Sequence, residues 1–553
     1  MDLPLVAEYA QSVPAKEAPP LSRTPLFTML RRALRQAHES HRSGIAPSEL
    51  VPAVREQRAL SRRTFVAGSS AALTALAVGG CATGGATSRP AVARAREEDP
   101  VLIVGAGIAG LTCAWRLAQA GVRTELFEAQ SRTGGRMFSL RGVFPEGQVC
   151  ELGGELIDTG HTRIRALAGE LGIELNDLAS DDPALRETVW HVGGAARSEQ
   201  EVVEAFLPIA RRILEVLAPF GPDFDPTAAA PQRAEALDRL TMAEWFDREG
   251  VSGWMRRLLE VAYTTEYGLE IDRQSALNFL LLIDPAAPPF RVFGDSDERF
   301  HVQGGNDRIV TALAERVAPS IETGSVLEAV SRRADGRFTA TFRRDSGVRT
   351  VIARHVVLTL PFTLLRDVEL DVPMPAAKRR AIAELGYGTN AKLMVGFASR
   401  PWRERHGSNG SVVTDLPFQL VWETSRLQAG RAGILTNFSG GQHGVAVGQG
   451  SAEDQAIALV RDLERVFPGV TAAHEGSPAV RFHWPTNRWV RGSYASYLAG
   501  QYTTVRGLEG ASVGTLHFAG EHCSLRAQGY MEGGCETGEQ AAARVLQAVG
   551  ATR

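Results

Sequence analysis

The chain has 553 residues, which is enough for two or three domains with cores of their own. Hydrophobic residues make up 44% and charged residues 22%, values that exclude a fibrous or disordered protein. A formal net charge of −3, with no basic run interleaved with aromatic residues, excludes nucleic acid as an expected partner.

The first 97 residues divide into an N-terminal extension, 1–60, and a signal-like segment with its linker, 61–97. In the second segment, Arg62 and Arg63 stand before a modest apolar run, which resembles a twin-arginine export signal. The run is too short to span a membrane comfortably. It ends in Val-Gly-Gly-Cys, which resembles a lipoprotein cleavage box with Cys81 as the lipidated residue. We therefore expect export to the periplasm or anchoring as a lipoprotein; the alternative is an ordinary helix with two arginines.

A dinucleotide-binding unit is predicted after this linker. Val101–Val104 is a continuous apolar run and predicts a buried parallel strand. The turn Gly105–Gly110 follows, then an apolar helical stretch from 111 to 120, and the chain returns through a second strand to Glu128. Because strand, glycine turn, helix and acid stand in this order, they predict a dinucleotide site rather than some other glycine-rich turn.

Each part of this unit has a physical task. Gly105 permits the tight turn, Gly107 lets the backbone approach a pyrophosphate, and Gly110 allows the helix to pack closely on the strand. The phosphates would lie at the free N–H groups and positive end of the helix. Glu128 ends the second strand, where a carboxylate can accept both hydroxyls of a ribose.

Further motifs distinguish FAD from NAD. Residues 131–136 form a second glycine-rich turn ending in an arginine, and 151–155 read Glu-Leu-Gly-Gly-Glu. Near the C-terminus, 517–521 read His-Phe-Ala-Gly-Glu and 528–534 read Gln-Gly-Tyr-Met-Glu-Gly-Gly. An NAD enzyme has no general need for these motifs. Together they resemble those of the flavin amine oxidase family, which includes monoamine, polyamine and L-amino acid oxidases.

The resemblance covers about residues 98 to 550 and implies FAD as the cofactor. It implies that Arg136 and the backbone of the glycine pair lie along the flavin and pyrophosphate, and that Val326 touches the adenine. It also implies that the C-terminal strand and the following helix, expected over 536–548, hold the ribityl chain and the flavin ring. The residues expected to bind FAD are Gly105, Gly107, Ala109, Gly110, Glu128, Gln130, Arg136, Gly153, Gly154, Val326, Gly520, Glu521 and Met531.

The predicted fold class is α/β, with a Rossmann-type FAD-binding domain that is discontinuous in sequence. We assign 98–160, 302–362 and 480–553 to this domain. The intervening segments, 161–301 and 363–479, are assigned to an α+β substrate-binding domain. No pair of the five cysteines has the spacing of metal ligands, so no metal site is expected.

Lys392 is the first candidate for a catalytic residue. Only three of the 60 basic residues are lysines, Lys16, Lys378 and Lys392, so a lysine inside an apolar segment needs an explanation. Period-2 alternation places it on one face of a strand with Met394. The segment resembles the family strand whose lysine binds a water at flavin N5, where a positive charge could assist reoxidation by O₂. The alternative is a lysine on an edge strand whose ammonium group reaches solvent.

Tyr494 and Tyr530 are the second candidates. They fall where monoamine oxidases place two facing tyrosines in front of the flavin, an arrangement that can align a neutral amine; the alternative is two core aromatics. Monoamine oxidases attach FAD through a cysteine just before the first tyrosine, and Ser493 stands at that position here. We therefore predict non-covalent FAD. Cys523 and Cys535 do not match the attachment position and are interpreted as buried small residues.

The substrate is less well defined by the sequence. Several L-amino acid oxidases follow the glycine pair with an arginine that binds the substrate carboxylate, whereas this chain has Glu155 and Asp158 there. The two acids could face a cationic substrate or serve as hydrogen-bonding supports. Three arginines elsewhere could replace the missing one, although a surface or structural role is the more ordinary fate of each: Arg291, Arg299 and Arg526.

We therefore expect an FAD-dependent amine oxidase that converts an L-amino acid or a primary amine, with O₂, into an imine or carbonyl compound, ammonia and H₂O₂. An L-amino acid is narrowly preferred because the FAD is predicted to be unattached. The alternatives are a flavin-dependent desaturase or dehydrogenase acting on C–C bonds, a non-catalytic flavin-binding protein, and an NAD-dependent dehydrogenase. The sequence leaves monomer and homodimer open.

Overall fold

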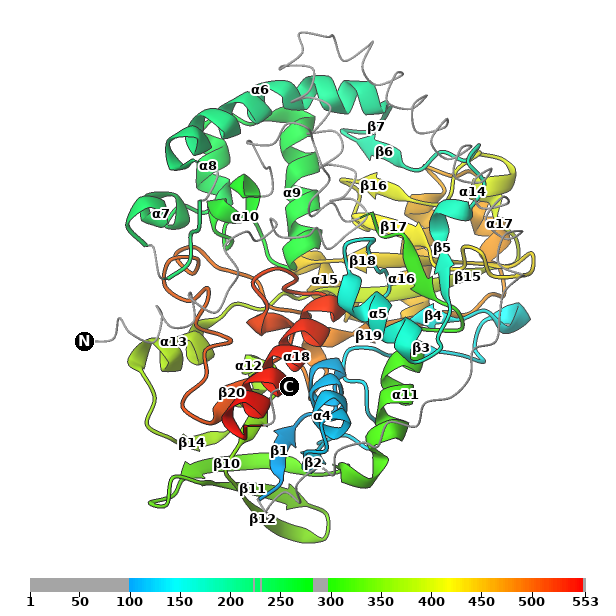
Figure 1. The fold of residues 1–553 in the computed structure, drawn as a ribbon. Coiled ribbons are helices and arrows are strands. Elements are labelled where there is room, and N and C mark those ends of the chain that lie inside the picture. The colour runs from blue at the N-terminus through cyan, green and yellow to red at the C-terminus, as the bar shows by residue number, and fades with distance from the viewer. Residues whose placement is uncertain (1–98, 222–223, 229–230, 282–296, 551–553) are drawn as a thin grey trace, which may run out of the picture.

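The computed structural model describes residues 99–221, 224–228, 231–281 and 297–550 (Figure 1). The predicted extension, the export signal and Cys81 lie outside these residues. In the described part of the chain, no helix combines the length and the apolar character needed to cross a bilayer.

A five-stranded parallel sheet carries the glycine-rich turn. Its strand order is β20-β13-β1-β2-β9, so β1 is central and buried along its whole length. This topology confirms the predicted Rossmann-type α/β class. The bounds are β1 (Val101–Val104), β2 (Thr124–Phe127), β9 (Ile321–Glu322), β13 (Val356–Leu358) and β20 (Leu516–Phe518).

Three helices accompany this sheet: α4 (Ile108–Gln119), α11 (Asp307–Val317) and α18 (Met531–Ala548). Helix α18 lies directly against α4, and a Cβ at Gly538 would come within 2.4 Å of the Ala109 carbonyl oxygen. The close approach therefore requires glycine at this position. Helix α18 begins at residue 531, earlier than the stretch over 536–548 predicted from the sequence, so its first turn includes the Met-Glu-Gly-Gly motif.

A four-stranded sheet lies beside the parallel sheet, at the lower end of Figure 1. Its order is β12-β11-β10-β14, and β10 and β11 form an antiparallel hairpin that begins at Val326. The rings of Phe127 in β2 and Phe342 in β11 stack with their centroids 4.2 Å apart, which joins the two sheets. The bounds are β10 (Val326–Arg332), β11 (Phe338–Arg344), β12 (Gly347–Ala353) and β14 (Glu369–Asp371).

The third large sheet has seven strands and is mixed. Its order is β19-β15-β18-β17-β16-β6-β7. Strand β15 buries alternate apolar residues against α16 (Ala452–Leu463), and its opposite face carries Lys392 and Met394. The bounds are β6 (Val189–Val192), β7 (Ala195–Arg197), β15 (Ala391–Phe397), β16 (Val412–Thr414), β17 (Leu420–Glu423), β18 (Gly433–Ser439) and β19 (Ala479–His483).

A group of helices lies at the opposite end of Figure 1 from the four-stranded sheet. It consists of α6 (Glu199–Leu217), α7 (Pro231–Asp238), α8 (Met242–Arg248), α9 (Gly253–Tyr267) and α10 (Ala276–Leu280). Tyr263, Tyr267 and Phe279 are buried here and pack on one another, so they belong to the core. The C-terminal end of α9 contacts a distant segment of the chain, because the Tyr494 hydroxyl donates to the Glu266 carbonyl oxygen.

Shorter elements connect these layers. They are β3 (Ser139–Leu140), β4 (Cys150–Glu151), α5 (Thr162–Glu170), β5 (Leu175–Asp177), β8 (Phe300–Val302), α12 (Phe362–Leu365), α13 (Ala376–Glu384), α14 (Pro401–Glu404), α15 (Gly441–Val447) and α17 (Val470–His474).

Candidate active site

One continuous pocket runs from the glycine turn after β1 to the inner face of β15. It brings together all the residues predicted to bind FAD except Gly110 and Val326, and all three predicted catalytic residues. Val326 begins β10 outside the pocket lining, although the neighbouring Ser325 N–H donates to the Glu128 carbonyl oxygen at 2.8 Å. The end of the pocket near β1 is referred to below as the nucleotide end and the end near β15 as the amine end.

The glycine turn at the nucleotide end leaves room for a ligand at one position only. Gly105 has φ +104°, and a Cβ there would lie 2.4 Å from the Thr359 hydroxyl oxygen. A Cβ on Gly110 would lie 1.9 Å from the Gly105 carbonyl oxygen, so Gly110 permits close packing behind the pocket wall. A Cβ on Gly107 would meet no atom within 4 Å and would project into open space beside the start of α4. A pyrophosphate would fit there.

Glu128 is buried at the same end and is held by the backbone. One carboxylate oxygen accepts the Ala106 N–H and the other accepts the Gln130 N–H, each at 2.8 Å. Burial raises the pKa of Glu128, although these two hydrogen bonds and Arg132 act in the opposite direction. Each carboxylate oxygen keeps capacity for a further hydrogen bond. Glu128 can therefore accept the two hydroxyls of a ribose.

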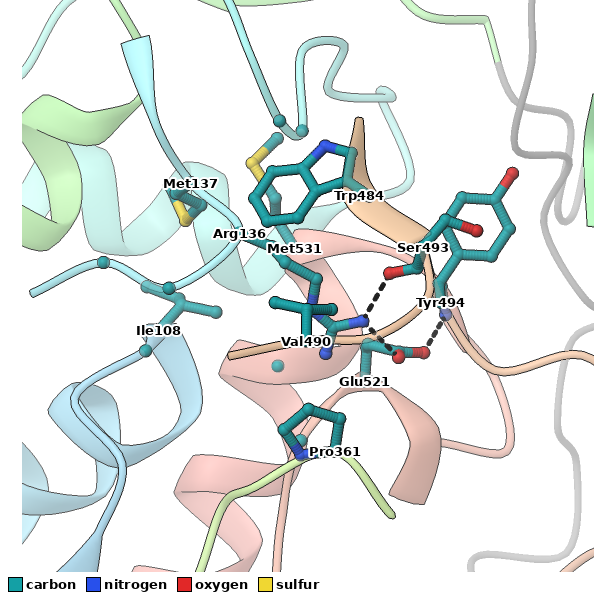
Figure 2. A pocket seen from close by; sticks show the side chains of 18 of the residues that line it. Ile108, Arg136, Met137, Pro361, Trp484, Val490, Ser493, Tyr494, Glu521 and Met531 are labelled. Atoms are coloured by element: carbon teal, nitrogen blue, oxygen red, sulfur yellow. Dashed lines mark hydrogen bonds and ion pairs between the residues drawn. The ribbon is translucent and has the colours of Figure 1, made fainter. Parts of the chain in front are cut away.

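Arg136 and Glu521, which both line the pocket, form an ion pair (Figure 2). Arg136 Nη1 lies 2.7 Å from Glu521 Oε1 and donates to the Ser493 carbonyl oxygen at 2.9 Å. Glu521 also accepts the N–H groups of Gly529 and Ala495. This pair therefore fixes the positions of three chain segments that are distant in sequence.

The glycine pair packs directly against the start of α18 at the pocket wall. A Cβ on Gly153 would lie 1.8 Å from the Arg136 carbonyl oxygen, and one on Gly154 would lie 2.9 Å from Met531 Cγ. Met531 is the first residue of α18, which has no side-chain cap. The first N–H groups of α18 are therefore available to an electron-rich ligand group at the pocket wall.

These features fit FAD better than they fit a smaller ligand. The open position at Gly107 suits a pyrophosphate, and Glu128 suits a ribose. Ser493 lines the pocket and donates through its hydroxyl to Asn390 Oδ1 at 2.6 Å. Among the described residues, no cysteine lines the pocket; Cys523 and Cys535 are buried elsewhere as free thiols.

Lys392 lies at the amine end, and its side chain is only 3% exposed. Strand β15 is paired with β18 on one side and β19 on the other, so the edge-strand alternative is wrong. The Lys392 Nζ atom lies 2.6 Å from Glu155 Oε2 and 3.1 Å from the Gly153 carbonyl oxygen. Its ammonium group is therefore held beside the glycine pair.

Glu155 is the partner of Lys392 and has further donors of its own. Trp422 donates from its indole nitrogen to Glu155 Oε1 at 2.9 Å, and the Thr424 hydroxyl donates to the same oxygen. Burial raises the pKa of this carboxyl group, but the charge of Lys392 and these hydrogen bonds outweigh burial and leave the pKa below its ordinary value. Glu155 therefore lies in the pocket as a carboxylate.

The two candidate tyrosines reach the pocket from different elements. Tyr494 donates its hydroxyl to the Glu266 carbonyl oxygen at 2.8 Å, at the end of α9. Tyr530 precedes α18, and its ring packs edge-on against His161 with centroids 4.7 Å apart. Both line the pocket, which is compatible with the predicted aromatic pair.

Glu298 is a pocket residue that no sequence pattern predicts. It has φ +46°, a strained conformation for a non-glycine residue, and its N–H donates to Asp158 Oδ1 at 2.8 Å. Burial raises the pKa of Glu298 well above its ordinary value, and four neighbouring carboxyl groups add to the shift. No periodic pattern or glycine marks this position in the sequence, so only the tertiary structure identifies it. The four neighbours are Asp158, Glu266, Glu155 and Asp297.

The arginines considered for a substrate carboxylate are not part of the described pocket. Arg299 pairs with Asp177 at 2.6 Å, and Arg526 is exposed outside the lining. Arg291 lies outside the described residues. Asp158 lies behind Glu298 rather than in the lining, so it supports the pocket wall as a hydrogen-bond acceptor. Arg136 is the arginine among the described lining residues, and Glu521 pairs with it.

Comparison with known proteins identifies the class. The fold and pocket are those of a flavin-dependent oxidoreductase, and the family model for flavin containing amine oxidoreductases matches residues 108–546. The chain therefore belongs to the family of flavin containing amine oxidoreductases. This confirms the predicted family and the use of a flavin by it.

Individual relatives are distant. A flavin-dependent L-tryptophan oxidase of Lentzea aerocolonigenes is 27% identical, over 82% of this chain and 99% of its own length. An L-amino acid dehydrogenase of Synechocystis is 24% identical, over 80% of this chain and 94% of its own. The structure of cyclohexylamine oxidase from Brevibacterium oxydans matches with a TM-score of 0.72 at 22% identity, covering 82% of this chain and 100% of that one. A putrescine oxidase bound to putrescine matches with a TM-score of 0.69 at 22% identity, covering 81% and 99%.

Proposed function

We propose that the protein is an amine oxidase with non-covalently bound FAD that oxidises a primary amine without a carboxylate group. The amine and O₂ yield an imine and H₂O₂, and water converts the imine into a carbonyl compound and ammonia. The observation that carries this proposal is the charge of the amine end. There the described lining holds Glu298 and the Lys392–Glu155 pair, and the arginine further along is occupied by Glu521.

The chain's own residues have separable roles in this proposal. FAD, when bound, supplies the two-electron oxidation of the C–N bond. The backbone around Gly107 and the carboxylate of Glu128 would hold its pyrophosphate and ribose. Tyr494 and Tyr530 would orient the amine from two sides. Trp422, also in the lining, excludes water from the ion pair of Lys392.

Glu298 supports a cationic substrate. A carboxyl group whose pKa is raised well above normal lies where negative charge is unfavourable, and a positive charge brought to it relieves that penalty. An ammonium group entering the pocket can thus take the place of the proton on Glu298. A substrate carboxylate would add another negative charge to the same region.

An L-amino acid is the second candidate substrate. Relatives named as L-tryptophan oxidase and L-amino acid dehydrogenase match nearly their whole length, and this similarity favours it. Lys392 is the one cation at the amine end of the described lining, and Glu155 already neutralises it. For this reason we place the amine first.

Matched substrate pairs test whether the substrate is a primary amine or an L-amino acid. Each amino acid and the amine formed by removing its carboxyl group, such as L-lysine with cadaverine or L-tryptophan with tryptamine, differ in that group alone. We expect peroxide formation with a kcat/KM at least roughly tenfold higher for the amine of the productive pair, because one uncompensated buried charge costs more than about 1.4 kcal/mol. A higher value for the amino acid would reverse the assignment.

We also propose export through the twin-arginine signal, which rests on the sequence around Arg62 and Arg63. Replacing both arginines with lysine should leave the protein in the cytoplasmic fraction, whereas the unaltered chain is recovered outside it. Cys81→Ala tests lipidation in the same fractionation. If Cys81→Ala partitions with membranes as the unaltered chain does, Cys81 is not the anchor.

A further inference from the structure

We propose that Glu155 is a positioning residue that keeps Lys392 protonated and at the same time weakens its electrostatic effect on the reaction with O₂. This inference rests on the proposed function and on the position of Lys392 beside the glycine pair, which would lie along the flavin. It goes beyond that function because it makes the ion pair, rather than the lysine alone, the determinant of how readily electrons pass to O₂.

The geometry of the pair supports this role. The Lys392 and Glu155 side chains are 3% and 5% exposed and lie 2.6 Å apart. Glu155 is fixed by donors from Trp422 and Thr424, and Lys392 is fixed on the internal strand β15. Neither charged group can turn toward solvent without breaking several contacts. The pair therefore stays formed when the pocket is filled.

Burial gives the carboxylate its effect on the lysine. A lysine removed from water without a counter-ion loses its proton readily, because a lone charge is poorly solvated there. A carboxylate at 2.6 Å offsets that cost. Seen from elsewhere in the pocket, the two opposite charges act as a dipole, whose field falls off faster than that of a single cation. Lys392 thus remains charged, and its attraction for developing negative charge is reduced.

Two other titratable groups face this pair. Cys150 interacts with both charges, but burial raises the pKa of its thiol to about 12, so it stays neutral. Glu298 interacts with Glu155 and has a raised pKa. The neighbouring strands present Phe438 and Phe482 opposite Lys392, and neither carries a charge. Glu298 is therefore the group whose titration must be separated from that of the pair.

Glu155→Gln is the matched substitution, because it keeps the shape and the acceptor for Trp422 while removing the charge. The flavin of the purified holoenzyme is reduced photochemically, so no amine is needed, and is then mixed with O₂ from pH 6 to 9. In the wild type we expect the reoxidation rate to change less than about twofold. In Glu155→Gln we expect it to exceed the wild-type rate at pH 6 and to fall at least roughly tenfold by pH 9, as Lys392 loses its proton.

Three further variants test whether the pH dependence of reoxidation in Glu155→Gln comes from Lys392. The pH dependence should disappear in the double variant Glu155→Gln/Lys392→Met and should be absent in Glu155→Asp, which retains the charge. The double variant Glu155→Gln/Glu298→Gln should keep the pH dependence of Glu155→Gln, which excludes Glu298 as its source. A Glu155→Gln profile as flat as that of the wild type, or a pH dependence that survives loss of Lys392, would overturn the proposal.

A second readout needs neither flavin nor substrate. In thermal unfolding of the apoprotein, Glu155→Gln and Lys392→Met should each lower Tm, and the double variant should be more stable than the sum of the two losses predicts. Additive losses would show that the two side chains do not act as a pair. Photoreduction and unfolding require no amine, so both tests remain valid if the proposed substrate is wrong. Failure of the proposed function is recognised by a different result, namely that no amine bleaches the flavin.

Discussion

The two ends of the pocket are built by different means. At the nucleotide end, backbone groups and glycines from a short stretch of chain make the binding surface, and Gly107 leaves space without any side chain. At the amine end, charged and aromatic side chains from separate elements meet, and Lys392 and Glu155 are 237 positions apart. The first end can therefore be altered by adding a side chain, and the second by removing a charge.

The largest expected effect comes from filling the nucleotide end. Gly107→Val would place a side chain where the pyrophosphate fits, so the purified protein should lack the flavin absorbance band altogether. Gly169→Val is the matched control. As at Gly107, a Cβ added to Gly169 would meet no atom within 4 Å, but Gly169 lies on α5, away from the pocket. A yellow Gly107→Val protein would show that the pyrophosphate lies elsewhere.

Removing the cation at the amine end should leave the nucleotide end intact. Lys392→Met is expected to retain FAD but to slow reoxidation by O₂ by at least roughly tenfold, because a positive charge stabilises the developing superoxide. Stopped-flow mixing of the reduced protein with O₂ measures this directly. Unchanged kinetics would remove Lys392 from the oxidative reaction.

Removing the carboxyl group at the amine end tests the substrate. Glu298→Gln should raise KM for a cationic amine about tenfold, which corresponds to about 1.4 kcal/mol, with little change in kcat. The neighbouring Asp297→Asn is the control, since Asp297 is exposed and bonds Thr159 outside the lining. If both variants change KM equally, general surface charge rather than Glu298 attracts the substrate.

The smallest effect concerns Lys378, a buried lysine for which the described residues provide no ion pair. On α13 it donates to the carbonyl oxygens of Leu508 and Glu509, and burial lowers its pKa to about 7. Between that value and about 10.4 for an unfolded lysine, the unfolded chain binds more protons, so wild-type stability rises with pH.

Lys378→Met should remove this contribution. Its free energy of unfolding should therefore rise less steeply from pH 7 to 9 than that of the wild type, by about 1 kcal/mol per pH unit. Urea unfolding at several pH values measures the slope, and flavin reoxidation should match the wild type. Equal slopes for the two proteins would show that Lys378 keeps its proton throughout this range.

The difference between the two ends also explains what the sequence could predict. Strand, turn and helix at the nucleotide end are adjacent along the chain, so spacing alone predicted the roles of Gly105 and Gly110, whose contacts agree with them. Lys392 stood out because lysine is rare in this chain. Its partnership with Glu155 depends on how β15 packs on the glycine pair, which no local pattern encodes.

Glu298 illustrates the same limit more strongly. Its strained backbone and its position beside four other carboxyl groups arise from tertiary contacts, and its neighbours in sequence are ordinary charged residues. The narrow preference for an L-amino acid rests on Ser493 and on the predicted lack of a covalent bond to FAD. The charge of the pocket is a more direct indicator of the substrate, and it favours an amine.

The most direct test of the central claim is an anaerobic absorbance spectrum of the purified protein mixed with primary amines before air is admitted. We expect an oxidised flavin band that an amine bleaches and that returns on aeration with formation of H₂O₂. A flavin band that no amine or amino acid bleaches would contradict the assignment as an amine oxidase. It would favour a desaturase or a non-catalytic flavoprotein on the same fold.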